Sequence, residues 1–299
     1  MICLGSEPTY FNIEGLAENS ISLKRLSDAV RIKDSIEQLF HQKIIYNKKI
    51  SIVIGGGGYS GTELAAELTN YRDRLLDNQT NSNSLVQISI LEAADRLLCN
   101  LDPKISEIAK RKLISYHVNL LFNCMIKKVT NEHIETVSGQ RYPYDLLIWT
   151  GGIKASSILL KSGFKTNKHG QIRVDDNLKV IGYNDIFAAG DCVEYIMPQT
   201  KIPVPSLGQT AKEQGKIAGE NIFRLVNDED FLEYKYKNFG FLIPLRGRYV
   251  VAVLNFIHIH GFLAWVIQQL IFLRYLVEIL PVYRAIKRWN QFERSLEQD

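Results

Sequence analysis

A glycine-rich segment, KISIVIGGGGYSGTE at residues 49–63, constrains the fold more than any other part of this sequence. The apolar run from Ile50 to Ile54 predicts a buried strand. Gly56, Gly58 and Gly61 follow at G-x-G-x-x-G spacing, and apolar residues then recur near the period of a helix. A strand, a glycine turn and a helix in this order predict a unit that holds the pyrophosphate of a dinucleotide.

Each glycine of the motif has a separate physical reason. Gly56 permits the tight turn from strand to helix, and Gly58 lets the backbone approach a pyrophosphate. Gly61 lets the helix lie close to the sheet, with its N-terminus toward the phosphates. We therefore expect all three glycines to bind the cofactor.

An acidic residue closes the next predicted strand, residues 86–91. The carboxylate of Glu92 can accept hydrogen bonds from both ribose hydroxyls of NADH, and it would repel a 2′-phosphate. Glu92 lies farther from Gly61 than the usual roughly 20 residues, and the polar run at 78–84 accounts for the excess. The alternative is a glycine-rich turn followed by an unrelated surface glutamate.

Composition and charge exclude several other classes of protein. A chain of 299 residues with 46% hydrophobic residues is long enough for two domains, and a net charge of +4 is too mild to suggest nucleic acid. The first residues lack the basic region of a signal peptide, so we expect no export. The four cysteines form no C-x-x-C pair and no metal-ligand cluster, which favours isolated, buried cysteines: Cys3, Cys99, Cys124 and Cys192.

A second set of strands predicts a flavin-binding half. The apolar strand 146–149 leads to Gly152, and a short apolar strand ending at Gly190 delivers Asp191, which could bind the polyol chain of a flavin. The following helix, 206–225, is rich in small residues, so its positive end could approach the flavin ring and stabilise the reduced form. An ordinary turn aspartate is the alternative for Asp191.

The last third of the chain changes character. After a strand at 249–254, residues 261–292 mix large apolar and aromatic residues with arginine and lysine. This mixture favours helices lying on a membrane surface, while a spanning helix and a buried or dimer-forming helix stay open. Elsewhere the patterns predict a helix at 21–40, a helix after Asp102 and a hairpin around residues 138–140.

The order of these motifs resembles the type II NADH:quinone oxidoreductases, single-chain flavoproteins with two Rossmann-like dinucleotide-binding domains. The resemblance covers essentially the whole chain. Tyr59 replaces a usual proline of the NADH motif. The segments that carry the resemblance are 4–7, 23–29, 54–68, 149–152, 186–191 and 209–214, and 261–265 looks most like the cyanobacterial and plastid branch.

The resemblance implies an enzyme with FAD and NADH as cofactors, which passes a hydride from NADH to the flavin and electrons to a membrane quinone without pumping protons. Glu63 resembles a catalytic glutamate near the nicotinamide and the flavin; the alternative is a first-turn acid stabilised by the helix dipole. Gln209, Glu213 and Gln214 resemble the quinone side of the site, although Glu213 stands where the family usually has glutamine.

The resemblance also implies a domain order. We expect a remnant of the FAD domain at 1–45, an NADH domain at 46–153, a second FAD segment at 154–230 and a membrane-associating region at 231–299. The family's own FAD-pyrophosphate motif has no counterpart here, so we expect either a truncated chain or a short form. The expected location is the cytoplasmic face of a bacterial membrane or the stromal side of a plastid membrane, and a homodimer stays open.

Three other functions stay open at this point. One is reduction of a demethylated naphthoquinone on the route to phylloquinone. Another is a disulfide reductase, against which the missing C-x-x-C argues. The third is a membrane-attached, nucleotide-binding fragment without flavin. The presence or absence of bound flavin would distinguish it from both enzymes.

Overall fold

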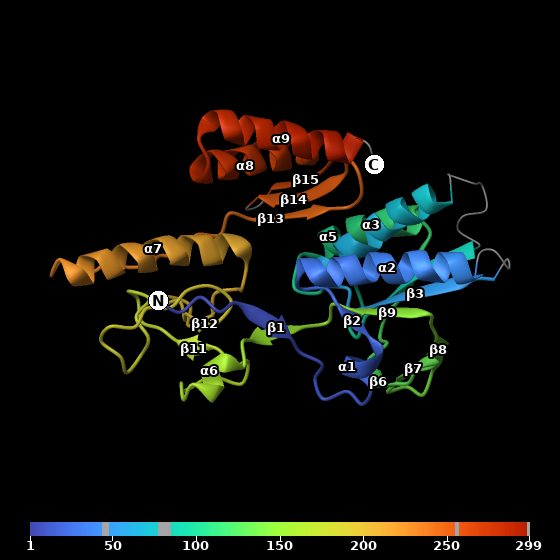
Figure 1. Cartoon of the computed structure of the whole chain (residues 1–299), viewed down its shortest axis with the longest axis horizontal. Helices are drawn as coiled ribbons and strands as arrows, with labels where there is room; N and C mark the ends of the chain where they lie inside the picture. Colours follow the sequence, from blue (N-terminus) through green and yellow to red (C-terminus); the bar gives the residue numbers. More distant parts are fainter. Residues whose placement is uncertain (44–47, 77–84, 255–256, 298–299) are drawn as a thin grey trace. The chain divides into compact units, whose positions relative to one another are not determined.

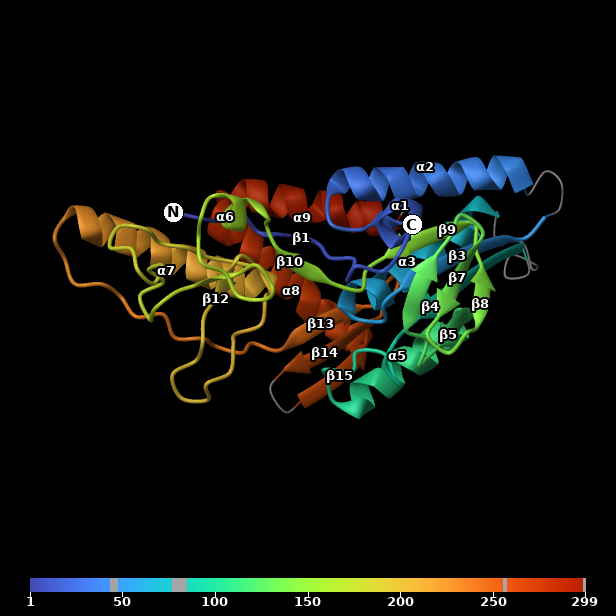
Figure 2. The same ribbon diagram turned by 90° about the horizontal axis from the view of Figure 1, so that it is seen from below.

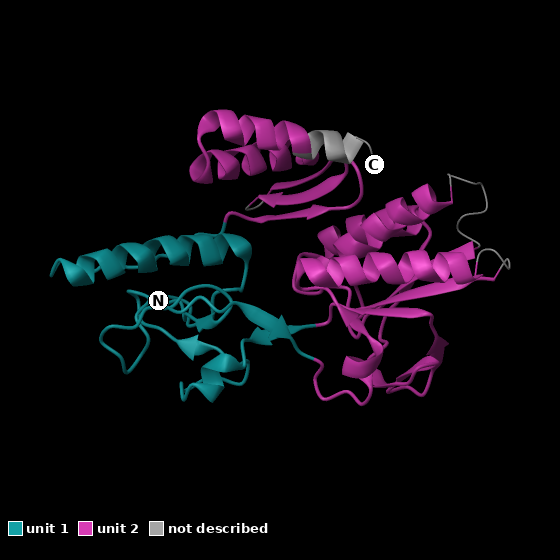
Figure 3. Cartoon of the chain, in the orientation of Figure 1, with its two compact units in different colours: residues 1–9, 152–238 teal, residues 10–151, 239–299 magenta. Residues whose placement is uncertain are grey.

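The computed structural model describes residues 1–43, 48–76, 85–254 and 257–297, with side chains up to residue 291. It divides into two compact units, which Figure 3 shows in different colours: residues 1–9 with 152–238, and residues 10–151 with 239–299. Residues 10–45 and 239–299 therefore group with the glycine-rich segment. Compactness alone does not show which cofactor a segment binds. The predicted division into segments 1–45, 46–153, 154–230 and 231–299 therefore stays a prediction.

A five-stranded parallel sheet organises the larger unit. Figure 1 labels its strands β2, β9 and β3, and Figure 2 labels β9, β3, β4 and β5. The strand order is β2 (Ile21–Ser22), β9 (Leu146–Trp149), β3 (Ile50–Gly55), β4 (Val86–Leu91) and β5 (Val118–Leu121). From β3 the chain proceeds outward through β4 to β5, and it returns to the other side of β3 as β9. A ligand crevice is expected at the carboxyl ends of the strands where this direction changes.

Both faces of this sheet are covered, which explains why its strands are mostly apolar. Ile52 and Ile54 of β3 pack in one core with helices on one face: α2 (Leu26–Lys43), α3 (Tyr59–Leu75) and α5 (Pro103–Ser115). Val53, between them, belongs to a second core with Ile126 and Ile134. The predicted α/β fold with a Rossmann-like parallel sheet is confirmed.

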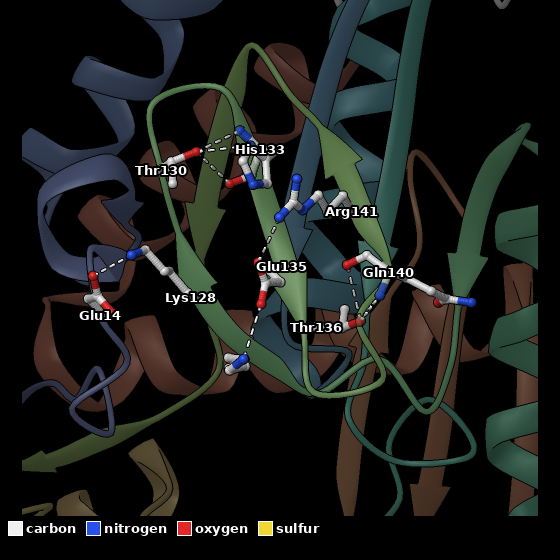
Figure 4. A network of polar contacts seen from close by, with 9 residues as sticks. Glu14, Lys128, Thr130, His133, Glu135, Thr136, Gln140 and Arg141 are labelled. Atoms are coloured by element: carbon white, nitrogen blue, oxygen red, sulfur yellow. Dashed lines mark hydrogen bonds and ion pairs between the residues drawn. The ribbon is translucent and has the colours of Figure 1, made fainter.

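The second core joins the main sheet to α1 (Leu16–Asn19) and to a three-stranded antiparallel sheet. Its strands are β6 (Ile126–Val129), β7 (His133–Thr136) and β8 (Arg141–Pro143), so the predicted hairpin is confirmed. On its surface, shown in Figure 4, the Glu135 carboxylate lies 3.1 Å from Lys127 Nζ and 3.6 Å from Arg141 Nη2. These cations hold the pKa of Glu135 below its usual value.

The smaller unit contains short strands and one long helix. Ile2 pairs with Ala188, and the fully buried Phe187 lies in the core of the unit. The elements are β1 (Ser6–Pro8), β10 (Ile153–Ala155), α6 (Ile158–Lys161), β11 (Ile172–Arg173), β12 (Val193–Glu194) and α7 (Gly208–Val226). The helix α7 corresponds to the one predicted at 206–225.

The C-terminal part of the larger unit is a β-meander followed by two helices. Its elements are β13 (Phe241–Pro244), β14 (Val250–Leu254), β15 (Ile257–Gly261), α8 (Phe262–Ile279) and α9 (Val282–Glu297). The sequence predicted the strand β14 but not its two partners. By length and composition, α8 could cross a membrane, with a mean hydropathy of 1.5.

The helix expected at 21–40 begins later than predicted. Ile21 and Ser22 pair with β9, and α2 starts at Leu26. The Asp28 carboxylate accepts the backbone N–H groups of Lys24 and Arg25, both at 2.9 Å, and so fixes this helix start. The local pattern could not separate β2 from the helix, because β2 pairs with β9, which is far away in the sequence.

Two smaller expectations are wrong. The segment that ends at Gly190 forms single bridges, from Ala188 to Ile2 and from Phe187 to Lys179, where a continuous strand was expected. Cys124 and Cys192 are buried as expected, but Cys3 and Cys99 are exposed. The polar run at 78–84 lies outside the described residues.

Candidate functional site

The glycine turn at the end of β3 is closed so tightly that two of its residues must be glycine. Gly56 has φ +108°, and a Cβ there would lie 2.7 Å from Gly151 Cα. A Cβ on Gly61 would lie 1.9 Å from the carbonyl oxygen of Gly56. The roles predicted for Gly56 and Gly61 in shaping the turn therefore have a direct steric cause.

Gly58 has a different environment. It is the N-cap of α3 with φ −73°, which other residues can adopt, and no side chain in the described part of the chain caps this helix end. A Cβ on Gly58 would meet no atom within 4 Å among the described residues. Its backbone is therefore open to close approach, and the N–H groups of the first turn of α3 can bind an anion.

Thr150 fixes the turn from the neighbouring strand. It follows β9, and its hydroxyl lies 3.1 Å from the Gly55 carbonyl oxygen and 3.0 Å from that of Gly56. The sequence placed Thr150 in a signature but did not predict this contact. A threonine directly after the strand beside β3 was the available signal.

Glu92 lies beside the turn, as the sequence predicted. Its carboxylate accepts the N–H of Gly57 at 2.5 Å and the N–H of Ala94 at 2.8 Å. These two backbone donors orient the carboxylate, and its remaining lone pairs can accept ribose hydroxyls. The turn and Glu92 together form a cradle that suits the adenosine half of a dinucleotide.

Glu63 lies one turn inside α3, whose first turn contains no acidic residue. Burial raises the pKa of Glu63 to about 7, and the charge of Glu67 adds to the rise. The interpretation of Glu63 as a first-turn acid stabilised by the helix dipole is wrong, because Glu63 lies beyond the first turn of α3. Glu63 can hold or release a proton near neutral pH.

In the smaller unit, Asp191 follows a turn that a glycine makes possible. Gly190 has φ +85°, and the Ser6 hydroxyl donates to Asp191 Oδ2 at 2.6 Å. The Gln171 side-chain amide donates to the backbone oxygen of Asp191 at 3.2 Å. Neither Ser6 nor Gln171 was predicted, since nothing in the local sequence pattern links them to Asp191.

Helix α7 brings Gln214 to the same turn. Gln214 is 2% exposed, and its side-chain oxygen accepts the N–H of Gly190 at 2.9 Å. Gln209 and Glu213 are partly exposed, one turn apart on α7. The structure therefore separates the three predicted quinone-side residues into one buried residue that holds the Gly190 turn and two that are accessible.

The smaller unit also has features that fit a flavin. Asp191 offers a carboxylate oriented by Ser6, which suits the hydroxyls of a polyol chain. Thr210, in the first turn of α7, is 4% exposed, and its hydroxyl has no hydrogen-bond partner among the described residues. A buried polar atom without a partner is costly, so a bound polar group there would satisfy it. Gly152 is the residue at which the chain re-enters the smaller unit, and its backbone oxygen accepts the N–H of Thr9 at 3.1 Å.

No group of three or more metal-ligating side chains occurs in the part of the chain that the structure describes. His260 Nδ1 lies 3.2 Å from the Tyr249 hydroxyl.

The parallel sheet, the glycine turn and Glu92 define a dinucleotide-binding protein. The chain belongs to the pyridine nucleotide-disulphide oxidoreductase family, whose pattern matches residues 1–215. It is similar to a type II NADH:quinone oxidoreductase of Haemophilus influenzae, with 30% identity over 83% of this chain and 60% of the relative. A relative of the same description from Staphylococcus epidermidis is 27% identical over 95% of this chain and 71% of its own length.

A solved structure supports the fold assignment. The NDH2 of Plasmodium falciparum in complex with NADH superimposes with a TM-score of 0.81 at 18% identity, covering 98% of this chain and 77% of that one. The chain therefore spans 60% of the length of the Haemophilus relative and 77% of the Plasmodium structure.

Two glycines of the turn allow a prediction that separates stability from binding. We expect Gly61→Ala to lower the free energy of unfolding by roughly 1–3 kcal/mol or more, because its Cβ would overlap the Gly56 carbonyl. Gly58→Ala should cost less than about 1 kcal/mol, since only the N-cap preference is lost. It should nevertheless raise the Kd of NADH at least about tenfold if the backbone at Gly58 binds the pyrophosphate, because the added methyl group would occupy that place. Urea unfolding and NADH titration measure the two effects, and an unchanged Kd for Gly58→Ala would refute the phosphate assignment.

Proposed function

We propose that this chain is an NADH-dependent oxidoreductase that uses FAD and reduces a membrane quinone. The observation that carries the proposal is the position of Glu92, whose carboxylate is held against the glycine turn by the N–H of Gly57. This arrangement suits NADH and disfavours a cofactor with a 2′-phosphate. The similarity to type II NADH:quinone oxidoreductases supports the same activity.

The residues of the larger unit bind and orient NADH in this proposal. The first turn of α3 binds the pyrophosphate, with Gly56 and Gly61 shaping the turn and Gly58 permitting close approach. Glu92 accepts the ribose hydroxyls. Orientation of this kind contributes to the rate by holding the donor in a reactive geometry.

The residues of the smaller unit bind the flavin in this proposal. Asp191 accepts hydroxyl groups of the polyol chain, and Gly190 and Gly152 allow the backbone to approach the ligand closely. When bound, FAD supplies a hydride acceptor and an electron carrier, chemistry that side chains cannot perform. Gln214 keeps the Gly190 turn in place through its hydrogen bond to the Gly190 N–H.

Reduction of a quinone to a quinol consumes protons, and Glu63 is the residue we assign to hold one. Its pKa of about 7 means that both protonation states are populated at neutral pH. Gln209 and Glu213, which are accessible on α7, are the residues proposed to face the quinone. The helix α8 carries only Arg274 and Glu278 as charged residues, so we propose no proton pumping.

Membrane attachment is proposed for the surface that α8 and α9 form. Exposed apolar side chains cover both helices: Phe262, Leu263, Leu270, Ile271, Tyr275, Val277, Ile279, Val282, Tyr283 and Ile286. Arg284, Lys287 and Arg288 add positive charge on α9, which favours an anionic membrane surface such as the cytoplasmic side of a bacterial membrane or the stromal side of a plastid membrane.

Charged substitutions on α8 test this attachment. Leu263 and Leu270 are 60% and 61% exposed, so replacing both with glutamate should leave the fold intact. We expect binding to vesicles that contain anionic lipid to fall by roughly 100-fold or more, because each buried leucine contributes about 1.5–3 kcal/mol and the variant loses two. Sedimentation with vesicles measures this loss of binding. Leu160→Glu, at an equally exposed position on α6, is the control, and retention of the double variant would refute the attachment surface.

Calorimetric titration of the purified chain with NADH and NADPH tests the nucleotide part. We expect NADH to bind at least about tenfold more tightly, since the carboxylate of Glu92 repels the 2′-phosphate of NADPH. Equal affinities would contradict the role of Glu92.

A further inference from the structure

The β-meander that precedes α8 packs on the nucleotide-binding core. Ile243 and Leu245 are fully buried and Val251 is 1% exposed, and all three belong to the same apolar core as Ile52 and Ile54 of β3. The meander is therefore part of the larger unit, which contains the glycine turn, although it lies more than 90 residues beyond β9 in the sequence.

The two faces of the meander have different partners. Along β14, Val251 and Val253 pack against the nucleotide-binding core, whereas Val250 and Ala252 pack with Ala264 of α8. Leu242 of β13 also packs on the α8 side. This alternation is the expected result of a strand covered on both faces.

The contacts of the meander reach both ends of α3. At the start of α3, the ring of Tyr59 packs against the ring of Phe241, with centroids 5.5 Å apart and planes inclined by 38°. Near the end of α3, Arg246 Nη1 lies 2.7 Å from the Asp73 carboxylate and 3.3 Å from the Thr69 hydroxyl. The same Arg246 guanidinium lies 5.2 Å from the centre of the ring of Tyr116, the C-cap residue of α5.

Tyr59 is the first residue of α3, directly after Gly58. Among the described residues, no side chain caps this helix end, and no atom lies within 4 Å of a Cβ placed on Gly58. The ring contact of Tyr59 can therefore hold the phosphate-binding turn from this side. We propose that Phe241 is a positioning residue for NADH, acting through Tyr59 on the N-terminus of α3. The inference rests on the proposed NADH binding and adds a residue from the C-terminal third of the chain to it.

Phe241→Ala tests the proposal, with NADH affinity as the readout. Removing the ring lets the first turn of α3 shift, and small displacements of binding groups are costly. We expect the Kd of NADH to rise roughly five- to tenfold, whereas Phe241→Tyr, which keeps the ring, should bind as the parent does. Tyr59→Ala should cause a similar loss, and the double variant should lose little more than either single variant.

Leu242→Ala is the matched control for a merely structural effect. It removes a partly buried apolar side chain from the neighbouring position of the same strand, but on the face that packs toward α8. We expect it to lower the melting temperature about as much as Phe241→Ala does while leaving the Kd of NADH unchanged.

The outcomes distinguish this inference from the proposed function. If the parent binds NADH and Phe241→Ala binds it equally well, the positioning role is wrong and the proposed function stands. If Leu242→Ala weakens binding as much as Phe241→Ala, the effect is one of general stability and the inference also fails. A parent chain that binds no NADH would overturn the proposed function and this inference with it.

Discussion

Glu92→Ala should weaken NADH binding by at least roughly 150-fold. The carboxylate is proposed to accept both ribose hydroxyls, and hydrogen bonds to a charged group contribute about 1.5–3 kcal/mol each. The substitution also leaves the N–H groups of Gly57 and Ala94 without the acceptor that holds them in the folded chain. We therefore expect a combined loss of at least about 3 kcal/mol in binding free energy, which calorimetric titration measures directly.

Glu92→Gln separates the two contributions. Its amide oxygen can still accept one backbone N–H, but the charge is lost and the amide nitrogen offers no acceptor. We expect an intermediate affinity for NADH together with a weaker preference for NADH over NADPH, because the repulsion of a 2′-phosphate is removed. Unchanged affinity in both variants would show that Glu92 binds no ribose.

Glu63→Gln should stabilise the folded chain above neutral pH. Burial raises the folded-state pKa of Glu63 to about 7 from an ordinary 4.5, so the folded state holds a proton that the unfolded state releases between these values. Stability contributed by this group is therefore complete below about pH 4.5 and falls as the pH rises toward 7. The variant avoids this loss, and the difference in free energy of unfolding should grow to roughly 2–3 kcal/mol by pH 8.

Urea unfolding of both proteins between pH 5 and pH 8 measures this difference. Glu107→Gln is the control, because Glu107 is exposed and its pKa is lowered by the neighbouring Arg111, which gives the opposite sign of pH dependence. A difference between Glu63→Gln and the parent that does not change with pH would show that Glu63 ionises in the folded chain as it does in the unfolded chain.

Local patterns of the sequence predicted most of the nucleotide-binding half. The motif at Gly56, Gly58 and Gly61 and the acid Glu92 each depend on residues adjacent to one strand end, where the backbone geometry is nearly fixed by the fold. The start of α2 was wrong, because Ile21 joins the edge of a sheet whose partner strand, β9, is far away in the sequence.

The supporting contacts could not be predicted, since they join distant segments. Ser6 contacts Asp191, Thr150 contacts Gly56, and Phe241 contacts Tyr59, and each pair is brought together only by the tertiary fold. Periodicity reports burial along one element and carries no information about which element covers it. For the same reason, the burial of Gln214 against the Gly190 turn was not visible from its place in a quinone-side motif.

The visible absorption spectrum of the purified chain, recorded after incubation with FAD and gel filtration, tests the central claim most directly. The proposed function predicts a flavin absorption band that stays with the protein, is bleached by NADH and returns when a quinone is added. A colourless protein that still binds NADH would contradict the oxidoreductase and identify a nucleotide-binding chain without a flavin.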